Sequence, residues 1–209
     1  FDIDSSGDAV VLTIDGLGSG FVDFEAADAH TVQITHSGTG DFTYSSQATG
    51  LLTINASTTA SGNLNISTVG TAGATSIDVD GQLSVGGTGG ILLQATNGHI
   101  VLSDIASVLD AGTGDIAVIA SGGNIVVDNA TAQIEIDNTG TVALTAGAIG
   151  GVGNELDLSG ATSLSITDAA PGDIRVREQT ASTIVDTTIT QSAVNIGRID
   201  VDYFGDDVV

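Results

Sequence analysis

The chain has 209 residues, of which 26 are acidic and only three are basic, all of them arginine, for a formal net charge of -23 at pH 7. Nucleic-acid binding needs Lys and Arg to neutralise phosphates, so this charge argues against nucleic-acid partners and against anionic lipid surfaces. There is no cysteine, which excludes disulfides and thiolate metal sites, and there is no apolar run of about 18 residues that would insert into a membrane.

The composition favours many short strands joined by tight turns. The apolar residues are mainly Val, Ile, Leu and Ala, aromatic residues make up 3% of the chain, and Gly occurs 29 times. β-branched residues prefer strands, whereas Gly, Ser and Asn are frequent in turns. The mean hydropathy of +0.33 is too high for a disordered tail, so we expect a folded unit without long helices.

The first segment, residues 1–75, has apolar-x-apolar pairs at uneven intervals of up to 13 residues. Phe and Tyr also concentrate here, so we expect a wider segment, a different type of repeat, or a cap. His30 and His36 flank the first pair, and we expect both on the outward face as solvent-exposed residues rather than as a shared metal site. The pairs are Val32/Ile34, Phe42/Tyr44, Leu52/Ile54 and Leu64/Ile66.

From residue 76 onward the pairs recur at a steadier step, mostly of eight to ten residues. The step is nine residues from Ile91 to Ile100, from Ile116 to Ile125 and from Ile125 to Ile134. A period of two buries one face of each strand, and the Gly- and Asn-rich turns between strands tolerate positive φ. If two units form a coil, one coil takes roughly 18 residues and the chain makes about eleven coils. The pairs are Ile77/Val79, Leu83/Val85, Ile91/Leu93, Ile100/Leu102, Ile116/Val118, Ile125/Val127, Ile134/Ile136, Val142/Leu144, Leu156/Leu158, Leu164/Ile166, Ile174/Val176, Val194/Ile196 and Ile199/Val201.

These patterns predict an all-β fold, a parallel β-helix (β-solenoid) of short strands with Gly/Asn turns and a right-handed sense. An antiparallel sandwich would have a more aromatic core, and a propeller would show a period of about 40 residues. The repeated use of Ile, Val and Leu at the paired positions instead favours a solenoid, in which aliphatic side chains stack in ladders. We expect one elongated solenoid over residues 1–209, with a less regular sub-region or cap at 1–75 and regular coils at 76–209.

Two phrases of the regular part carry a family resemblance: GTGDIAVIASGGNIVVDN (residues 112–129) and TGTVALTAGAIGGVGNELDLSGATSLSIT (residues 139–167). The segment of residues 86–177 resembles the β-helical repeats of filamentous-haemagglutinin-like and autotransporter-like bacterial exoproteins, in which a G-N-I-x-[LV] phrase recurs in each coil. The resemblance implies a secreted, right-handed parallel β-helix that displays or spaces binding regions away from the cell. It covers less than half of the chain and includes no catalytic motif.

Asp-x-Asp pairs are the candidate metal ligands. Asp78 and Asp80 share one outward sheet face, and Asp200 and Asp202 share another, so each pair could hold Ca²⁺ with backbone carbonyls and water. The alternative is a solvated acidic face. The Ca²⁺-binding nonapeptide G-G-x-G-x-D-x-U-x fails at Ile91, which stands where its Asp is needed. No cofactor is therefore required, and calcium is the one cofactor that the sequence suggests.

The arginines indicate structure rather than catalysis. Arg175 and Arg177 lie on the outward face of one predicted strand, and Glu155 and Asp157 lie on the same face about one coil earlier. Stacked in register, these residues would form a ladder of opposite charges. Exposed pairs of this kind contribute about 0.2–1 kcal/mol each.

These features favour a non-enzymatic structural and adhesive segment, the stalk or passenger of a bacterial adhesin, located outside the cell or on its surface. Its partners would be a protein or glycan receptor, or copies of itself. One alternative is a self-assembling subunit of an extracellular filament, sheath or surface layer, bridged by calcium. Another is a β-helical polysaccharide-active enzyme, but the chain has no Lys, no Trp, and only two Tyr to serve such chemistry.

Overall fold

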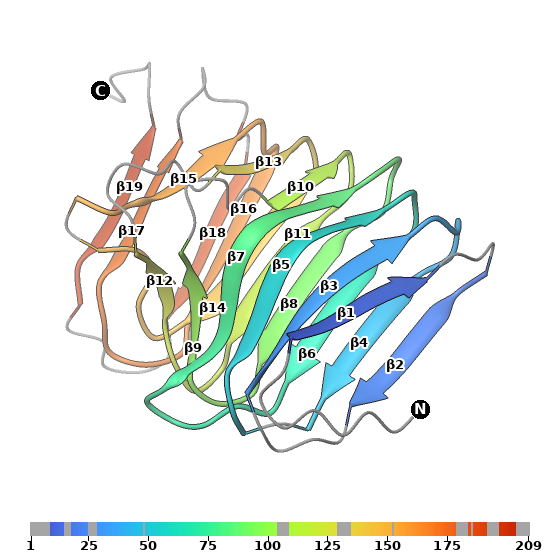
Figure 1. The fold of residues 1–209 in the computed structure, drawn as a ribbon. Helices are drawn as coiled ribbons and strands as arrows, with labels where there is room; N and C mark the ends of the chain where they lie inside the picture. The colour runs from blue at the N-terminus through green and yellow to red at the C-terminus, as the bar shows by residue number, and fades with distance from the viewer. Residues whose placement is uncertain are drawn as a thin grey trace.

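The computed structural model describes residues 9–14, 18–24, 29–47, 49–103, 109–128, 135–151, 153–178, 184, 186–191 and 197–203. Across these ranges the chain forms β-strands and no helix, wound into a stack of parallel strands (Figure 1). The predicted all-β parallel β-solenoid is therefore confirmed, while its right-handed sense stays a prediction. The described ranges contain no helix long and apolar enough to cross a membrane.

Each coil contributes to two parallel sheets, which we call sheet A and sheet B and which enclose one core. The eleven strands of sheet A are β1 (Ala9–Ile14), β3 (His30–His36), β5 (Leu52–Thr59), β7 (Thr75–Val85), β9 (His99–Leu102), β10 (Leu109–Gly112), β12 (Ile125–Val127), β13 (Glu135–Asn138), β15 (Leu156–Ser159), β17 (Ile174–Glu178) and β19 (Ile199–Tyr203). The eight strands of sheet B are β2 (Gly20–Phe24), β4 (Phe42–Ser46), β6 (Leu64–Thr68), β8 (Ile91–Ala95), β11 (Ile116–Ala120), β14 (Thr141–Ala146), β16 (Ser163–Asp168) and β18 (Asp186–Gln191).

One coil is longer than the sequence suggested. Phe42 pairs with Leu64, 22 residues later, and Leu64 pairs with Ile91, 27 residues later. The expected coil of roughly 18 residues, and with it the count of eleven coils, is therefore wrong. The reason is that three apolar units, not two, complete a coil: the long strand β7 carries two of them and β8 carries the third. Eight strands at a spacing of about 4.8 Å make sheet B about 34 Å long.

The core is built of ladders in which one residue of every coil packs on its equivalent in the next. The apolar pairs predicted from Val32/Ile34 to Ile174/Val176 are buried wherever their side chains are described. Ile134, Val194 and Ile196 lie outside the described residues, as does the side chain of Ile136. Burying one such side chain contributes about 1.5–3 kcal/mol, so the ladders supply most of the driving force. One ladder of sheet A runs through His30, Leu52, Ile77, Ile100, Ile125, Ile149, Ile174 and Ile199.

A column of glycines marks the corner before sheet B. A Cβ on Gly89 would overlap the carbonyl oxygen of Gly62, and a Cβ on Gly114 would overlap that of Gly89. The sequence predicted corner glycines for their positive φ, which holds at Gly98 and Gly112. In this column only Gly62 has a positive φ, so glycine is required mainly because successive coils approach too closely to leave room for a Cβ. The column consists of Gly40, Gly62, Gly89, Gly114 and Gly140.

Candidate functional site

The first predicted calcium pair lies on the outer face of β7. Asp80 is exposed, whereas Asp78 is partly buried and its Oδ1 is buried without a hydrogen-bond partner. Burial raises the pKa of Asp78, a hydrogen bond with Ser103 opposes this shift, and the charges of Asp80 and Asp128 add to it. Within the described part of the chain, no three His, Asp or Glu side chains come close enough together to hold a metal.

The second predicted pair lies on β19, beside the arginines. Asp200 Oδ2 is 2.9 Å from Arg198 Nη2 and 3.6 Å from Arg175 Nη1. Asp202 lies opposite Arg177 in the parallel register of β17 and β19. Both carboxylates therefore lie next to guanidinium groups, which neutralise the negative charge that would attract a metal cation.

The predicted charge ladder forms at one of its two rungs. Arg177 donates to both carboxylate oxygens of Asp157, from Nε at 2.8 Å and from Nη2 at 2.9 Å. Unlike the exposed pair that the sequence suggested, this one has a buried partner, because Asp157 is only 2% exposed, and its hydrogen bonds raise the pKa of Arg177. Arg175 pairs with Asp173, two residues away in the chain, and with Asp200 opposite, rather than with Glu155.

The two N-terminal histidines are buried, and the expectation that they face solvent is wrong. Residues 30, 32, 34 and 36 have the same parity in one strand, so both histidines point into the core with Val32 and Ile34. His30 Nε2 lies 2.6 Å from the hydroxyl of Tyr44, and His36 Nε2 lies 3.0 Å from the carbonyl oxygen of Gly18. They do not form a shared metal site: each ring fills a core position and bonds to its own partner.

The corner aspartates and asparagines bond one coil to the next. Asp41 Oδ1 accepts the backbone N–H of Asn63 at 2.8 Å, and Asn63 Oδ1 accepts that of Gly90 at 2.8 Å. Asp115 Oδ1 accepts the N–H of Thr141 at 2.9 Å. These side chains are therefore inter-coil ties, in which a side-chain oxygen of one coil accepts a backbone N–H of the next.

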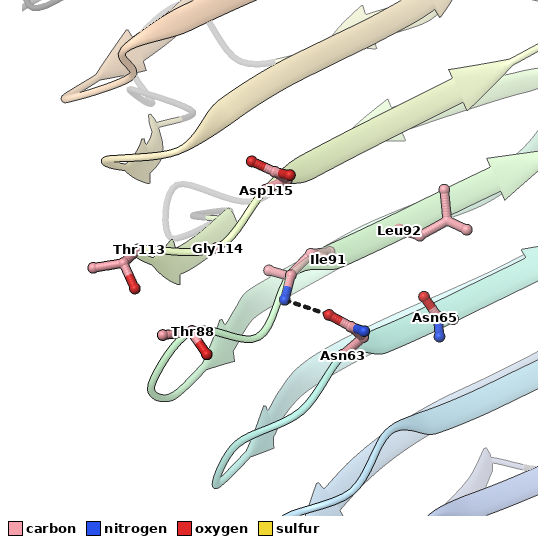
Figure 2. Close-up of a pocket in the computed structure, with 9 residues that line it drawn as sticks. Asn63, Asn65, Thr88, Ile91, Leu92, Thr113, Gly114 and Asp115 are labelled. Carbon is pink, nitrogen blue, oxygen red and sulfur yellow. Dashed lines mark hydrogen bonds between the residues drawn. The ribbon is translucent and has the colours of Figure 1, made fainter.

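A shallow hollow of about 290 Å³ opens at this corner, beside strands β6 and β8 (Figure 2). Its polar groups come from strands and from turns, while Leu92 supplies apolar surface; the side chain of Ile91 points into the core. The tie to Gly90 orients the Asn63 side chain, and the tie to Thr141 orients that of Asp115. The hollow is lined by Asn63, Asn65, Thr88, Gly90, Ile91, Leu92, Thr113, Gly114 and Asp115.

The hollow borders a surface that we call the neutral face: two rows of outward side chains that run in register across the six strands of sheet B from β4 to β16. All twelve are partly buried and none carries a charge, although the chain as a whole has a net charge of -23. The outward positions of sheet A, by contrast, include Asp78, Asp80 and Asp110 as well as the arginines. The neutral face consists of Thr43, Ser45, Asn65, Ser67, Leu92, Gln94, Ala117, Ile119, Ala143, Thr145, Ser165 and Thr167.

Sequence reasoning did not identify the hollow or the neutral face. The available signals were the recurring Gly-Asp or Gly-Asn corners, such as Gly114-Asp115, and the lack of charge at alternate positions in six strands. Neither signal identifies a surface until the register between coils is known, because residues such as Asn65 and Leu92 are 27 positions apart in the chain but adjacent in the sheet.

No family model, no curated protein and no solved structure matches the chain.

Proposed function

We propose that the chain is a non-enzymatic structural segment of a bacterial surface or secreted adhesin, a stalk that spaces binding regions away from the cell. The observation that carries this proposal is the core ladder from His30 to Ile199, which repeats one contact from coil to coil. Each further coil lengthens such a rod by about 4.8 Å with the same interactions.

Two further observations support a mechanical role. The corner side chains Asp41, Asn63 and Asp115 bond successive coils together. The high negative charge suits an extracellular milieu in which salt screens self-repulsion. The resemblance of residues 86–177 to bacterial exoprotein repeats points to the same location.

The test is a height measurement on the surface of a laboratory bacterium. One copy or two copies of the full chain are placed between a membrane anchor and an epitope, and the height of the epitope is measured by fluorescence localisation. We expect each copy to add about 34 Å, from eight strands at their usual spacing. A Gly/Ser linker of equal length is the control, since its height grows only with about the square root of its length. A second copy that adds no height would refute the stalk.

Self-assembly is a second candidate. Ile189 favours it, because this residue is 38% exposed on β18 while its partner Ile166 on β16 is buried. Light scattering at increasing concentration, with calcium and with EDTA, tests this candidate. A mass that stays monomeric in both solutions contradicts it, and release of new reducing ends from polysaccharides would instead support an enzyme.

A further inference from the structure

We propose that the neutral face and the hollow beside it bind a neutral, hydroxyl-rich polysaccharide. The inference rests on the proposed adhesive function and goes further, because it assigns a receptor class to this segment itself. It is carried by the charge distribution, by the chemistry of the outward side chains, and by the fixed polar groups of the hollow.

The charge distribution selects the partner. The chain carries 26 acidic residues, yet twelve neighbouring outward positions on sheet B carry none. A polysaccharide with carboxylate or sulfate groups is repelled by the net charge of -23, and a cationic polymer finds no carboxylate on the neutral face itself. An uncharged polymer meets neither obstacle, and the absence of charge spares it the cost of desolvating ions on binding.

The side chains of the neutral face match such a polymer chemically. Hydroxyl groups such as those of Thr43 and Thr145, and the amides of Asn65 and Gln94, both donate and accept hydrogen bonds, as sugar hydroxyls do. Leu92, together with Ala117 beside it in register and Ala143 one strand further, offers apolar surface to the C–H groups of sugar rings. The rows repeat at about 4.8 Å between strands, so weak contacts add up along an extended polymer.

The hollow supplies the oriented groups that a flat face lacks. Asp115 uses Oδ1 to hold the next coil, which leaves Oδ2 to accept hydrogen bonds from a ligand hydroxyl. Asn63 likewise uses Oδ1, which leaves its amide nitrogen as a donor, and Thr88 adds a hydroxyl from the neighbouring turn (Figure 2). At about 290 Å³ the hollow lies at the small end of ligand sites, which suits a short stretch of a polymer.

The test is native affinity electrophoresis of the full chain in gels that contain galactomannan, mannan or dextran. Gels with alginate or heparin form the anionic arm. We expect retardation by a neutral polymer and none by the anionic ones. The double variant Asn65→Asp/Gln94→Glu keeps the side-chain shapes but replaces two amides by acceptor-only carboxylates. We expect it to bind at least tenfold more weakly.

Gln33→Glu is the matched control, because Gln33 lies on an outward position of β3 in sheet A. It introduces one of the two negative charges that the double variant adds, but away from the neutral face, and should bind like the unmodified chain. Thermal melting of all variants checks that the fold is kept. The proposal is overturned if no neutral polymer retards the chain, if alginate or heparin binds more tightly, or if Gln33→Glu weakens binding as much as the double variant. A dimer that the double variant abolishes would also overturn it, in favour of a second copy as the partner.

The height measurement separates this proposal from the stalk. A chain that adds height per copy but is not retarded refutes only the receptor class. A chain that is retarded but adds no height refutes the stalk and leaves the polysaccharide site standing.

Discussion

Replacing Gly114 by Ala tests whether the approach of neighbouring coils fixes the corner glycines. The new Cβ would overlap the Gly89 carbonyl and lie 2.9 Å from Gly90 N, and real Cβ atoms essentially never come within 3.0 Å of another atom. Both neighbours are backbone, so the coils themselves must move apart. Overpacking of this kind costs about 1–3 kcal/mol, and the lower entropy of the unfolded Ala chain returns about 0.4–1 kcal/mol.

The net loss is therefore about 1–2 kcal/mol, which lowers the Tm of a chain of this size by about 3–6 °C. Circular dichroism melting and the urea midpoint both measure it. Gly151→Ala is the control, because its Cβ would meet nothing within 4 Å and its φ is not left-handed. If Gly114→Ala is no more destabilising than Gly151→Ala, the close-approach explanation of the glycine column is wrong.

Three further substitutions probe the polar groups. Asp157→Asn should cost about 1–3 kcal/mol in urea unfolding, because it removes the charge and one of the two acceptors that bind Arg177 at a buried site, while Asp202→Asn, at an exposed residue of β19, should cost little. Tyr44→Phe should cost about 1–3 kcal/mol, because it removes the hydroxyl that bonds His30. Burial raises the pKa of Tyr44, so the stabilisation by its hydroxyl should be complete below pH 10.0, the ordinary pKa of tyrosine, and decline above it. The urea midpoints of the unmodified chain and of Tyr44→Phe should therefore approach each other at higher pH, and a constant difference would contradict this. Asp78→Asn should stabilise the fold at pH 7 by roughly 0.5 kcal/mol, because burial raises the pKa of Asp78 and disfavours its carboxylate. In melting curves from pH 7 to pH 3 the gain should vanish as Asp78 becomes protonated, and Asp80→Asn is the exposed control.

The alternation of apolar residues was enough to predict the strands and the core. Pairs such as Ile77/Val79 and Ile116/Val118 are buried as expected, because a period of two leaves only one face for the core. The same rule, applied to the parity of residues 30 and 36, also gives the burial of His30 and His36. The local alternation of apolar residues therefore predicts both the fold class and the side of the strand on which each side chain lies.

The number of units in a coil could not be read from the sequence. A step of nine residues is compatible with two or three units per turn, and the choice depends on whether β7 continues through two units or turns between them. The role of Gly114 was hidden for a similar reason, since a glycine required for space and one required for positive φ look alike. The neutral face and the hollow depend on this register, and so they could not be found before it.

The tight turn at Gly151–Asn154 shows how such a stack can diversify. Ile149 and Leu156 are seven residues apart, yet they align with Ile174 and Val176, which are only two apart in the next coil. The five extra residues leave sheet A opposite Arg175 in β17 and return to it, and Gly151 and Gly153 have open space around them. A foreign peptide grafted at this point would project from the rod without disturbing the packing of the coils, so this turn is a natural site for acquiring new recognition loops.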